Sequence, residues 1–334
     1  MIRRKHEVFR PIGPLAARLT LALSCAFSAT VACGQPYPTK PVRIIVPISA
    51  GGNVDIITRT LAQRLTQSLG QQFIVDNRPG ASSIIGSEVV AKAPADGYTL
   101  LLNAAGSHTI NPGLFQKLPY DTVRDFTPVT TLARTALILV VHPSLPATSV
   151  KDLIALARTR PGAINAATGG NGTAGHMALE LFMSMSGTKV NHIPYKGNAP
   201  GLADTIAGHT VMMIDTLSTS LALVKAGKLR ALGLTSAQRS PLLPEVPTVA
   251  EAALPGFQGD VFILLLAPAG TPRETVGKLR SELVKIGENA EIRERFAQQG
   301  TDLMMTTSEQ SAAFIQQDIA KWRKVIAQAG IKVE

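Results

Sequence analysis

Apolar positions recur along the chain in two spacings, which predict alternating strands and helices. Short apolar runs at residues 42–46, 72–76 and 98–103 predict buried strands. Residues 54–69 carry apolar side chains three or four positions apart, which predicts a helix, and residues 83–92 predict another. Strands that alternate with helices form βαβ units, so this part of the chain predicts an α/β fold around a mainly parallel sheet.

The same alternation starts again after an apolar run at 135–141. Here we expect strands at 163–168, 189–194, 211–215 and 229–235, and helices over 150–158, 174–185, 199–207 and 219–226. The chain therefore predicts a second α/β lobe, again with a mainly parallel sheet flanked by helices.

The C-terminal part of the chain has one apolar strand, at 261–267. After it we expect helices over 272–288, 290–299 and 308–329. A lone strand cannot build a sheet of its own, so we expect this tail to return to the first lobe. The chain would then pass between the lobes twice, and these two crossovers would form a hinge.

The length of 334 residues and an apolar content of 45% suit a globular protein with two lobes. We expect lobe 1 to comprise residues 35–137 and 256–334, and lobe 2 to comprise residues 138–255. Residues 1–34 predict a secretory signal peptide that is cleaved after Gly34. In this segment basic residues precede the apolar run 19–32, which is too short to span a bilayer and ends in small residues.

Removal of this leader changes the chemistry expected of the mature chain. Both cysteines, Cys25 and Cys33, lie within it, so no disulfide, thiolate nucleophile or cysteine-bound metal is expected. A lipid on Cys33 is the less favoured alternative, because Thr30 stands where lipoprotein signals usually have Leu. The formal net charge falls from +10 to +6, because five basic residues and Glu7 leave with the leader. The remaining basic residues alternate with acidic ones and aromatic residues are only 4%, so nucleic acid is not an expected partner.

Two glycine-rich turns, one in each predicted lobe, lie between a buried strand and a helix. They are Ser-Ala-Gly-Gly-Asn at 49–53 and Gly-Gly-Asn-Gly-Thr-Ala-Gly at 169–175. The first N–H groups of a helix have no partner within it and carry partial positive charge, and glycine lets a ligand approach the backbone. Facing each other across a cleft, the two turns would hold a carboxylate without arginine. Three or four charge-assisted hydrogen bonds suffice for the ~8 kcal/mol of a micromolar complex.

The second turn also fits the dinucleotide-binding pattern G-x-G-x-x-G, from Gly170 to Gly175. That pattern needs an acidic residue about 20 positions on to bind the ribose. The next strand ends instead at Tyr195 and Lys196, and an exported protein has little access to the nucleotide. We therefore expect no nicotinamide, and no cofactor of another kind.

An exported enzyme is the minor alternative, because the common hydrolase motifs are missing from the sequence. His108 and His176 are candidate bases for a hydrolase, but no nucleophile motif accompanies either. His176 and Glu180, four apart on a helix, lack a third metal ligand nearby in the sequence, so they indicate a polar helix pair and we expect no metal. His108 follows a strand and either lines the cleft or caps its own loop.

Three further polar residues lie at strand ends or helix starts. Asp55 is first an acid at a helix N-terminus and second a neighbour of the ligand. Asp215 either orients a hydroxyl or amine of the ligand or caps the next helix. Tyr195 either offers its phenol to the cleft or packs beneath it.

Many short segments, in order along almost the whole mature chain, resemble the Bug-type substrate-binding receptors of tripartite tricarboxylate transporters. The matching segments are 37–47, 50–52 with Asp55, 76–80, 95–100, 108–112, 118–121, 125–129, 192–197, 226–232, 246–251 and 266–272. The resemblance implies a type II-like periplasmic binding protein, whose two α/β lobes close on a small carboxylate. It also implies delivery of that carboxylate, a di- or tricarboxylate, amino acid or aromatic acid, to a membrane permease.

By the same resemblance, the family's binding loops fall on residues 47–55 and 168–176, with a third contact region at 107–111. The sequence departs from the family pattern at 48–50, at Val54, and at Asn171 and Thr173, which leaves the rest of the ligand open. The expected ligand-binding residues are Ser49, Ala50, Gly51, Gly52, Asn53, Asp55, Ser107, His108, Thr168, Gly169, Asn171, Gly172, Thr173, His176, Tyr195 and Asp215.

These observations predict a receptor and not an enzyme, located in the periplasm and monomeric. Its expected partners are one small organic carboxylate and the permease subunits of a tripartite tricarboxylate transporter. A receptor that passes its ligand to a signalling partner fits the same residues and stays an alternative.

Overall fold

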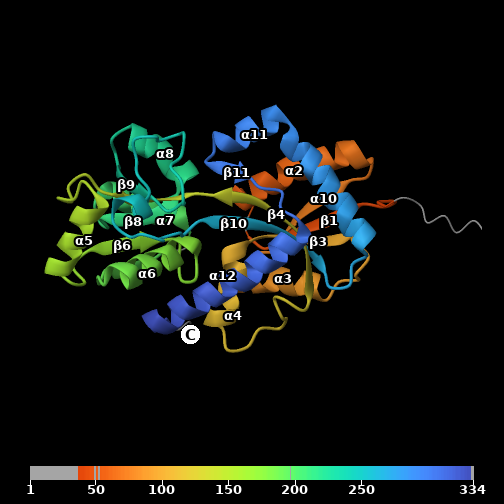
Figure 1. Cartoon of the computed structure of the whole chain (residues 1–334), viewed down its shortest axis with the longest axis horizontal. Helices are drawn as coiled ribbons and strands as arrows, with labels where there is room; N and C mark the ends of the chain where they lie inside the picture. The colour runs from red at the N-terminus through yellow and green to blue at the C-terminus, as the bar shows by residue number, and fades with distance from the viewer. Residues whose placement is uncertain (1–36, 49, 52, 196, 332–334) are drawn as a thin grey trace, which may run out of the picture. The chain divides into compact units, whose positions relative to one another are not determined.

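The computed structural model describes residues 37–48, 50, 51, 53–195 and 197–331, apart from the side chains of Asn53 and Ala329. The chain divides into two compact units, residues 1–39 and 40–334. All the helices and strands described below belong to the second unit (Figure 1). The expected signal peptide lies outside the described residues.

Within the described residues, the first sheet has six strands in the order β11-β4-β10-β3-β1-β2. They are β1 (Val42–Val46), β2 (Phe73–Asn77), β3 (Thr99–Ala104), β4 (Phe126–Thr135), β10 (Val261–Pro268) and β11 (Thr301–Leu303). Strand β1 pairs in parallel with β2 and β3, whereas β10 is antiparallel to β3 and β4, and β11 is antiparallel to β4. The C-terminal part of the chain therefore completes the first sheet, as its single apolar strand predicts.

The second sheet, in the same described part of the chain, has five strands in the order β7-β6-β8-β5-β9. They are β5 (Leu137–Val141), β6 (Asn165–Thr168), β7 (Asn191–Pro194), β8 (Met212–Thr216) and β9 (Arg230–Leu234). Strand β6 is parallel to β7 and β8, whereas β5 is antiparallel to β8 and β9. Two α/β sheets thus form, one from the outer parts of the chain and one from its middle.

Helices lie against both sheets (Figure 1). The longer ones are α2 (Asn53–Leu69), α3 (Ile84–Ala91), α5 (Val150–Thr159), α6 (Ala174–Ser186), α7 (Asn198–Ala207), α8 (Leu217–Lys225), α10 (Arg273–Glu288), α11 (Ala290–Ala297) and α12 (Ser308–Ala329). The short ones are α4 (Asn111–Leu114), α9 (Val249–Ala252), the 3-10 turn η1 (Ala81–Ser83) and the π-helical turn η2 (Gly106–Ile110). The helices expected from apolar spacing therefore form, with ends shifted by a few residues.

Both sheets are mixed, which corrects the expectation that they are mainly parallel. The parallel pairs are those that follow βαβ crossovers, such as β1 with β2 and β6 with β7. The antiparallel pairs arise because β10 and β11 run against the other strands of the first sheet, and β5 runs against its neighbours β8 and β9 in the second. The sequence pattern predicts strands but carries no signal for these directions.

Strands β4 and β11 are absent from the expected elements, for different reasons. Strand β4 contains Pro128 and four threonines, a composition that argues against a central strand. The register of β4 against β10 shifts between Leu265 and Leu266, and Pro128 pairs with Leu266 at this irregularity. Strand β11 has only three residues, too few to show alternation.

Strand β5 shows how the second sheet obtains its core. Its odd-numbered residues Leu137, Leu139 and Val141 pack on one face, against Phe182 among others. Its even-numbered residues Ile138 and Val140 pack on the opposite face. All five are buried, because helices cover both faces of this central strand.

The two sheets are joined by two short segments of chain. Only Ala136 separates β4 from β5. The second segment precedes β10, where the N–H of Gly259 donates to the carbonyl oxygen of Thr235 at 3.1 Å, and Thr235 in turn donates from its N–H to the carbonyl oxygen of Leu137 at 2.9 Å. The two crossings therefore lie side by side. The lobe boundaries at residues 137 and 255 stay a prediction.

Helix α12 of the first sheet's side also packs against α6 of the second. Met177 of α6 joins a buried apolar cluster with Trp322, Val325 and Ile326 of α12, together with Leu114 of α4. Among the helices that the structure describes, none combines the length and apolarity needed to cross a membrane.

Candidate functional site

The first glycine-rich turn follows β1 and leads into α2, and its conformation is held by Asp55. This carboxylate is 2% exposed and accepts a hydrogen bond from the N–H of Gly51 at 2.9 Å. It also accepts from Nε of Arg59 at 3.0 Å and from Nδ2 of Asn77 at 2.9 Å. Asp55 is thus an acid in the first turn of its helix that fixes the loop before it. Ser49, Gly52 and the side chain of Asn53 lie outside the described residues.

Asp55 is held in its charged form. Burial alone would raise the pKa of this carboxyl group, but the hydrogen bonds from Arg59, Gly51 and Asn77 outweigh burial and lower the pKa below its ordinary value. Arg59 and Asn77 are absent from the expected residues. Asn77 is the last residue of β2 and pairs with Val46, the last residue of the parallel strand β1. Residues at the shared carboxyl ends of parallel strands are candidate site residues, and this position would have identified Asn77.

Asp55→Asn should lower the free energy of unfolding by about 1–3 kcal/mol, because it weakens charge-assisted hydrogen bonds made by a buried group. Urea denaturation of the purified protein measures this. The matched control is Asp302→Asn, which removes a carboxylate that is 59% exposed and pairs with Arg134, and which should change stability by less than about 1 kcal/mol. Equal stability of Asp55→Asn and the parent chain would show that the carboxylate does not fix the loop.

The second glycine-rich turn follows β6 and leads into α6, and its first residues are bonded to one another. Thr168 is buried, and its Oγ1 accepts from the N–H of Gly170 at 3.2 Å. Thr173 caps α6, because its Oγ1 accepts from the N–H of His176. The same hydroxyl donates to the carbonyl oxygen of Gly170 at 2.8 Å. The turn is therefore preorganised by its own threonines.

His176 completes this turn from the helix. Its Nδ1 accepts from the N–H of Gly172 at 3.1 Å, so the proton of the neutral ring is on Nε2, which lies 3.4 Å from Oε1 of Glu180. The His176 ring stacks on that of His192 with centroids 4.2 Å apart. His176 is 4% exposed, so it supports the loop from beneath.

The sequence predicts that the backbone N–H groups of residues 171–173 hold a carboxylate. Two of these three amides already donate within the turn. They are the N–H of Gly172, to His176, and the N–H of Thr173, to the carbonyl oxygen of Gly170 at 3.3 Å. The N–H of Asn171 has no hydrogen bond to any residue that the structure describes, and Asn171 is exposed. Of these three amides, that of Asn171 alone therefore has no partner within the described residues.

His192 is a second histidine of this turn that sequence reasoning missed. Its Nε2 lies 2.6 Å from Oγ1 of Thr168, and burial together with the nearby His176 lowers its pKa from 6.5 to about 4. Strand β7 pairs with β6 so that His192 lies opposite Ala166, two residues before Thr168. That register was not readable from the sequence alone.

Asp215 does not cap α8, because the N-cap of this helix is Thr216 and Asp215 bonds side chains instead of backbone amides. It is completely buried, and its carboxylate accepts from the hydroxyls of Thr219 and Ser220 in α8. It also accepts from Nδ2 of Asn198 at 2.6 Å. The Asn198 side chain in turn lies directly against Gly169, where a Cβ would overlap its Oδ1. Asp215 thus positions the second turn through Asn198.

Tyr195 packs beneath the second turn. Its hydroxyl donates to Oδ2 of Asp204 at 2.6 Å, and this hydrogen bond, with burial, raises the pKa of the phenol. Its ring lies against Gly201 of α7. The phenol therefore points to Asp204 of α7, the helix that follows Tyr195 in the chain.

His108 and Ser107 lie in η2, and His108 corrects the expectation of a cleft-lining base. His108 is completely buried, its Nε2 donates to the carbonyl oxygen of Thr122 at 2.9 Å, and its ring meets Phe126 edge-on. Burial lowers its pKa from 6.5 to about 4. Ser107 is half-buried and donates to Oδ1 of Asn103 at 2.8 Å. His108 thus ties the loop before β4 to the end of β3.

The expected residues fall into two groups that the described part of the structure does not join by a hydrogen bond. One surrounds the first turn with Asp55, and the other surrounds the second turn with His176 and Asp215. The second turn touches the first lobe at Leu114, whose Cδ1 is 3.2 Å from a Cβ placed on Gly172. Across residues 37–331, leaving out 49, 52 and 196, no three His, Cys, Asp or Glu side chains gather as metal ligands.

Known proteins match this chain over most of its length. The family model described as "Tripartite tricarboxylate transporter family receptor" matches residues 57–331. "Protein BugT" of Bordetella pertussis is 35% identical over 320 residues, which cover 94% of this chain and 98% of that protein.

Solved structures agree with the sequence match. A structure described as R. palustris Rpa4515 with adipate is 38% identical, has a TM-score of 0.81, and covers 89% of this chain and 99% of its own. MatC from Rhodopseudomonas palustris, with bound malate, is 28% identical with a TM-score of 0.77, and covers 87% of this chain and 100% of its own. Both likenesses extend over most of the chain, and the α/β fold predicted from the sequence is confirmed. The chain belongs to the tripartite tricarboxylate transporter receptor family, a family of Bug-type solute-binding proteins and not of enzymes.

Proposed function

We propose that this chain is a periplasmic receptor that binds a small dicarboxylate between its two lobes and delivers it to the permease of a tripartite tricarboxylate transporter. The observation that carries the proposal is the likeness to the adipate-containing structure, at 38% identity over 89% of this chain. Adipate and malate, named in the two related structures, are both dicarboxylic acids. One carboxylate for each glycine-rich turn fits such a ligand.

The two turns support this proposal by a shared construction. In each, one amide is turned inward to a side chain of the following helix, Gly51 to Asp55 and Gly172 to His176. This bond fixes the loop before any ligand arrives, so little conformational entropy is lost on binding. The adjoining Asn171 amide then stands at the N-terminus of α6, where partial positive charge favours an anion.

Location in the periplasm and closure of the lobes belong to the same proposal. Residues 1–34 have the pattern of an export signal, and we propose cleavage after Gly34. The adjacent crossings at Ala136 and Gly259 place the two connections at one point, which suits a hinge.

Isothermal titration of the mature chain with adipate, malate, citrate and benzoate tests the proposal. We expect at least one of the dicarboxylates to bind with a micromolar Kd, equivalent to about 8 kcal/mol, and dimethyl adipate, which lacks both charges, to give no heat. Mass spectrometry of the mixture should recover the acid unchanged, as a receptor requires. Absence of heat with every acid in the panel would contradict the proposed function.

A further inference from the structure

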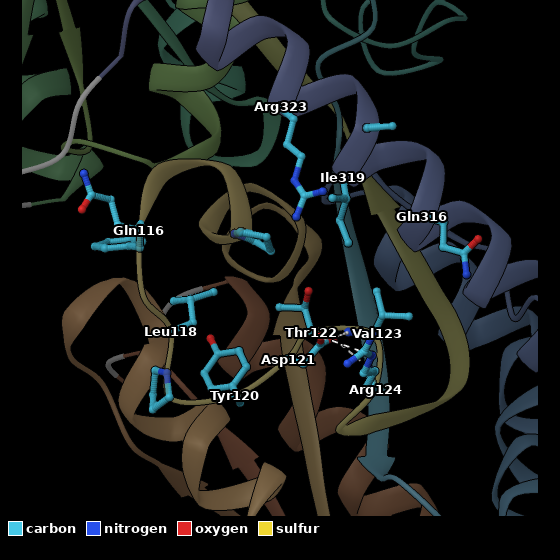
Figure 2. A pocket seen from close by; sticks show the side chains of 14 residues that line it. Gln116, Leu118, Tyr120, Asp121, Thr122, Val123, Arg124, Gln316, Ile319 and Arg323 are labelled. Carbon is cyan, nitrogen blue, oxygen red and sulfur yellow. Dashed lines mark hydrogen bonds and ion pairs between the residues drawn. The ribbon is translucent and has the colours of Figure 1, made fainter.

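A cavity of about 740 Å³ lies on the first lobe, between α12 and the segment that follows α4 (Figure 2). None of the expected ligand-binding residues lines it. Its walls are Pro112, Phe115, Gln116, Leu118, Pro119, Tyr120, Asp121, Thr122, Val123, Arg124, Gln316, Ile319, Ala320 and Arg323. The cavity is therefore separate from the proposed carboxylate site.

The lining combines apolar surface with a surplus of positive charge, since two arginines, Arg124 and Arg323, share one acid, Asp121. Ile319 and Tyr120 form buried parts of the wall, while Val123 is a large apolar residue left 44% exposed. Arg323 makes no hydrogen bond or ion pair with any residue in the described part of the chain, and in Figure 2 its guanidinium points down from α12 toward the cavity. Apolar contacts beside a surplus of positive charge suit a partner that carries a carboxylate next to apolar side chains.

The one acid of the lining, Asp121, offsets only part of this charge, although the charges of Arg124 and Arg323 contribute to lowering its pKa. Its Oδ1 already accepts from the N–H groups of Val123 and Arg124, at 2.8 and 2.9 Å. Its Oδ2 lies 3.9 Å from Nε of Arg124, whose side chain is 87% exposed. One carboxylate thus faces two guanidinium groups, and both arginines are exposed at the rim.

The cavity adjoins the contact between the two lobes. Gly113 of α4 lies so close to α12 that a Cβ there would be 2.7 Å from Cδ1 of Ile326 and 3.4 Å from Cγ of Arg323. The next residue, Leu114, meets Gly172 of the second glycine-rich turn, and Phe115 then lines the cavity. Helix α4 is therefore packed between the cavity wall and a loop of the other lobe.

We propose that this cavity is the docking surface for a partner protein, which inserts a segment bearing an acidic side chain beside apolar ones. The partner is the membrane component of the transporter, so the inference rests on the proposed function. A surface next to the Leu114–Gly172 contact changes when the lobes separate, which lets the partner distinguish the closed receptor from the open one. A protein partner fits better than a small molecule, because eight of the lining residues are exposed and would leave a small ligand largely in water. These are Gln116, Pro119, Asp121, Val123, Arg124, Gln316, Ala320 and Arg323.

Charge reversal at the rim tests the inference. Arg124→Glu and Arg323→Glu are made separately, because Arg323 packs on Gly113 whereas Arg124 lies on an exposed turn. Lys324→Glu, the exposed neighbour of Arg323 outside the cavity, is the matched control. Uptake of radiolabelled adipate or malate, whichever titrates, is measured in cells that lack their own copy of this gene and express each variant at equal level.

We expect both arginine variants to reduce uptake at least tenfold while the Kd for the acid in titration stays within twofold, and Lys324→Glu to leave both values unchanged. Full uptake by Arg124→Glu and Arg323→Glu with unchanged Kd would overturn the inference and leave the proposed function standing. Binding of a second acid molecule per chain in the titration of the parent, lost in Arg323→Glu, would also overturn the inference. The cavity would then be a small-molecule site. If the parent chain bound none of the acids in titration, the proposed function itself would be refuted.

Discussion

Gly175→Ala is expected to lower the free energy of unfolding by about 2–3 kcal/mol and to weaken carboxylate binding at least tenfold. A Cβ at this position would lie 2.5 Å from the carbonyl oxygen of Ile214 in β8. The neighbour is backbone, which has no rotamer that relieves the overlap, so α6 must move away from the sheet. His176 follows directly in α6 and holds the amide of Gly172, so the second turn moves with the helix.

Urea denaturation and titration with adipate or malate measure the two effects. Gly277→Ala is the matched control, because Gly277 lies within α10 and a Cβ there has no neighbour within 4 Å. That control should gain about 0.5–1 kcal/mol of stability, as alanine does over glycine inside a helix, with binding unchanged. Parent-like stability and affinity of Gly175→Ala would mean that α6 need not approach β8 this closely.

The second large effect is a loss of stability by about 3 kcal/mol as the pH falls from 6.5 to 4, caused by His108. Burial lowers the pKa of this ring from 6.5 to about 4 in the folded chain. Between these two values the unfolded chain binds a proton that the folded chain does not, so acid favours unfolding. His192, also shifted to about 4, acts in the same direction. The contribution of His108 is complete above pH 6.5.

Urea denaturation at pH 7, 6, 5 and 4 follows this loss. His108→Gln keeps an N–H donor for the carbonyl oxygen of Thr122 but does not titrate, so its stability should fall by about 3 kcal/mol less across the same range. The comparison uses the slope with pH, which a uniform loss of stability in the variant does not alter. His209→Gln, at a side chain that is 73% exposed, is the control and should keep the parent slope. Identical slopes for His108→Gln and the parent chain would rule out His108 as the cause.

The helices and most strands could be predicted because burial alone decides their pattern. Apolar spacing from Val54 to Leu69 marks the face of α2 that packs on its sheet, with Ile57, Leu61 and Leu65 at most 1% exposed. Strand β4 could not be predicted from apolar spacing, because Thr130, Thr131 and Thr135 are buried. Their hydroxyls form hydrogen bonds with other parts of the chain. A strand buried through polar side chains has no alternation for the sequence to display.

The two glycine-rich turns between a strand and a helix could be predicted from the sequence, but the roles of the side chains around them could not. A sequence shows that Asp215 ends a strand, yet not that its carboxylate is used up by Asn198, Thr219 and Ser220. Tyr195 likewise turns to Asp204, nine residues away, because α7 brings the two together. Polar residues near a ligand loop divide into those that meet the ligand and those that hold the loop, and only tertiary contacts separate them.

The interrupted order of the first sheet bears on how the chain acquires its structure as it emerges. Strand β10, residues 261–268, lies between β3 and β4 and joins them by hydrogen bonds. Every strand of the second sheet, in contrast, lies within residues 137–234. The middle of the chain therefore has all its sheet partners first, and the portion made earliest waits for the portion made last. A chain of this design keeps the sheet of its first half unfinished until residues 261–268 have been made.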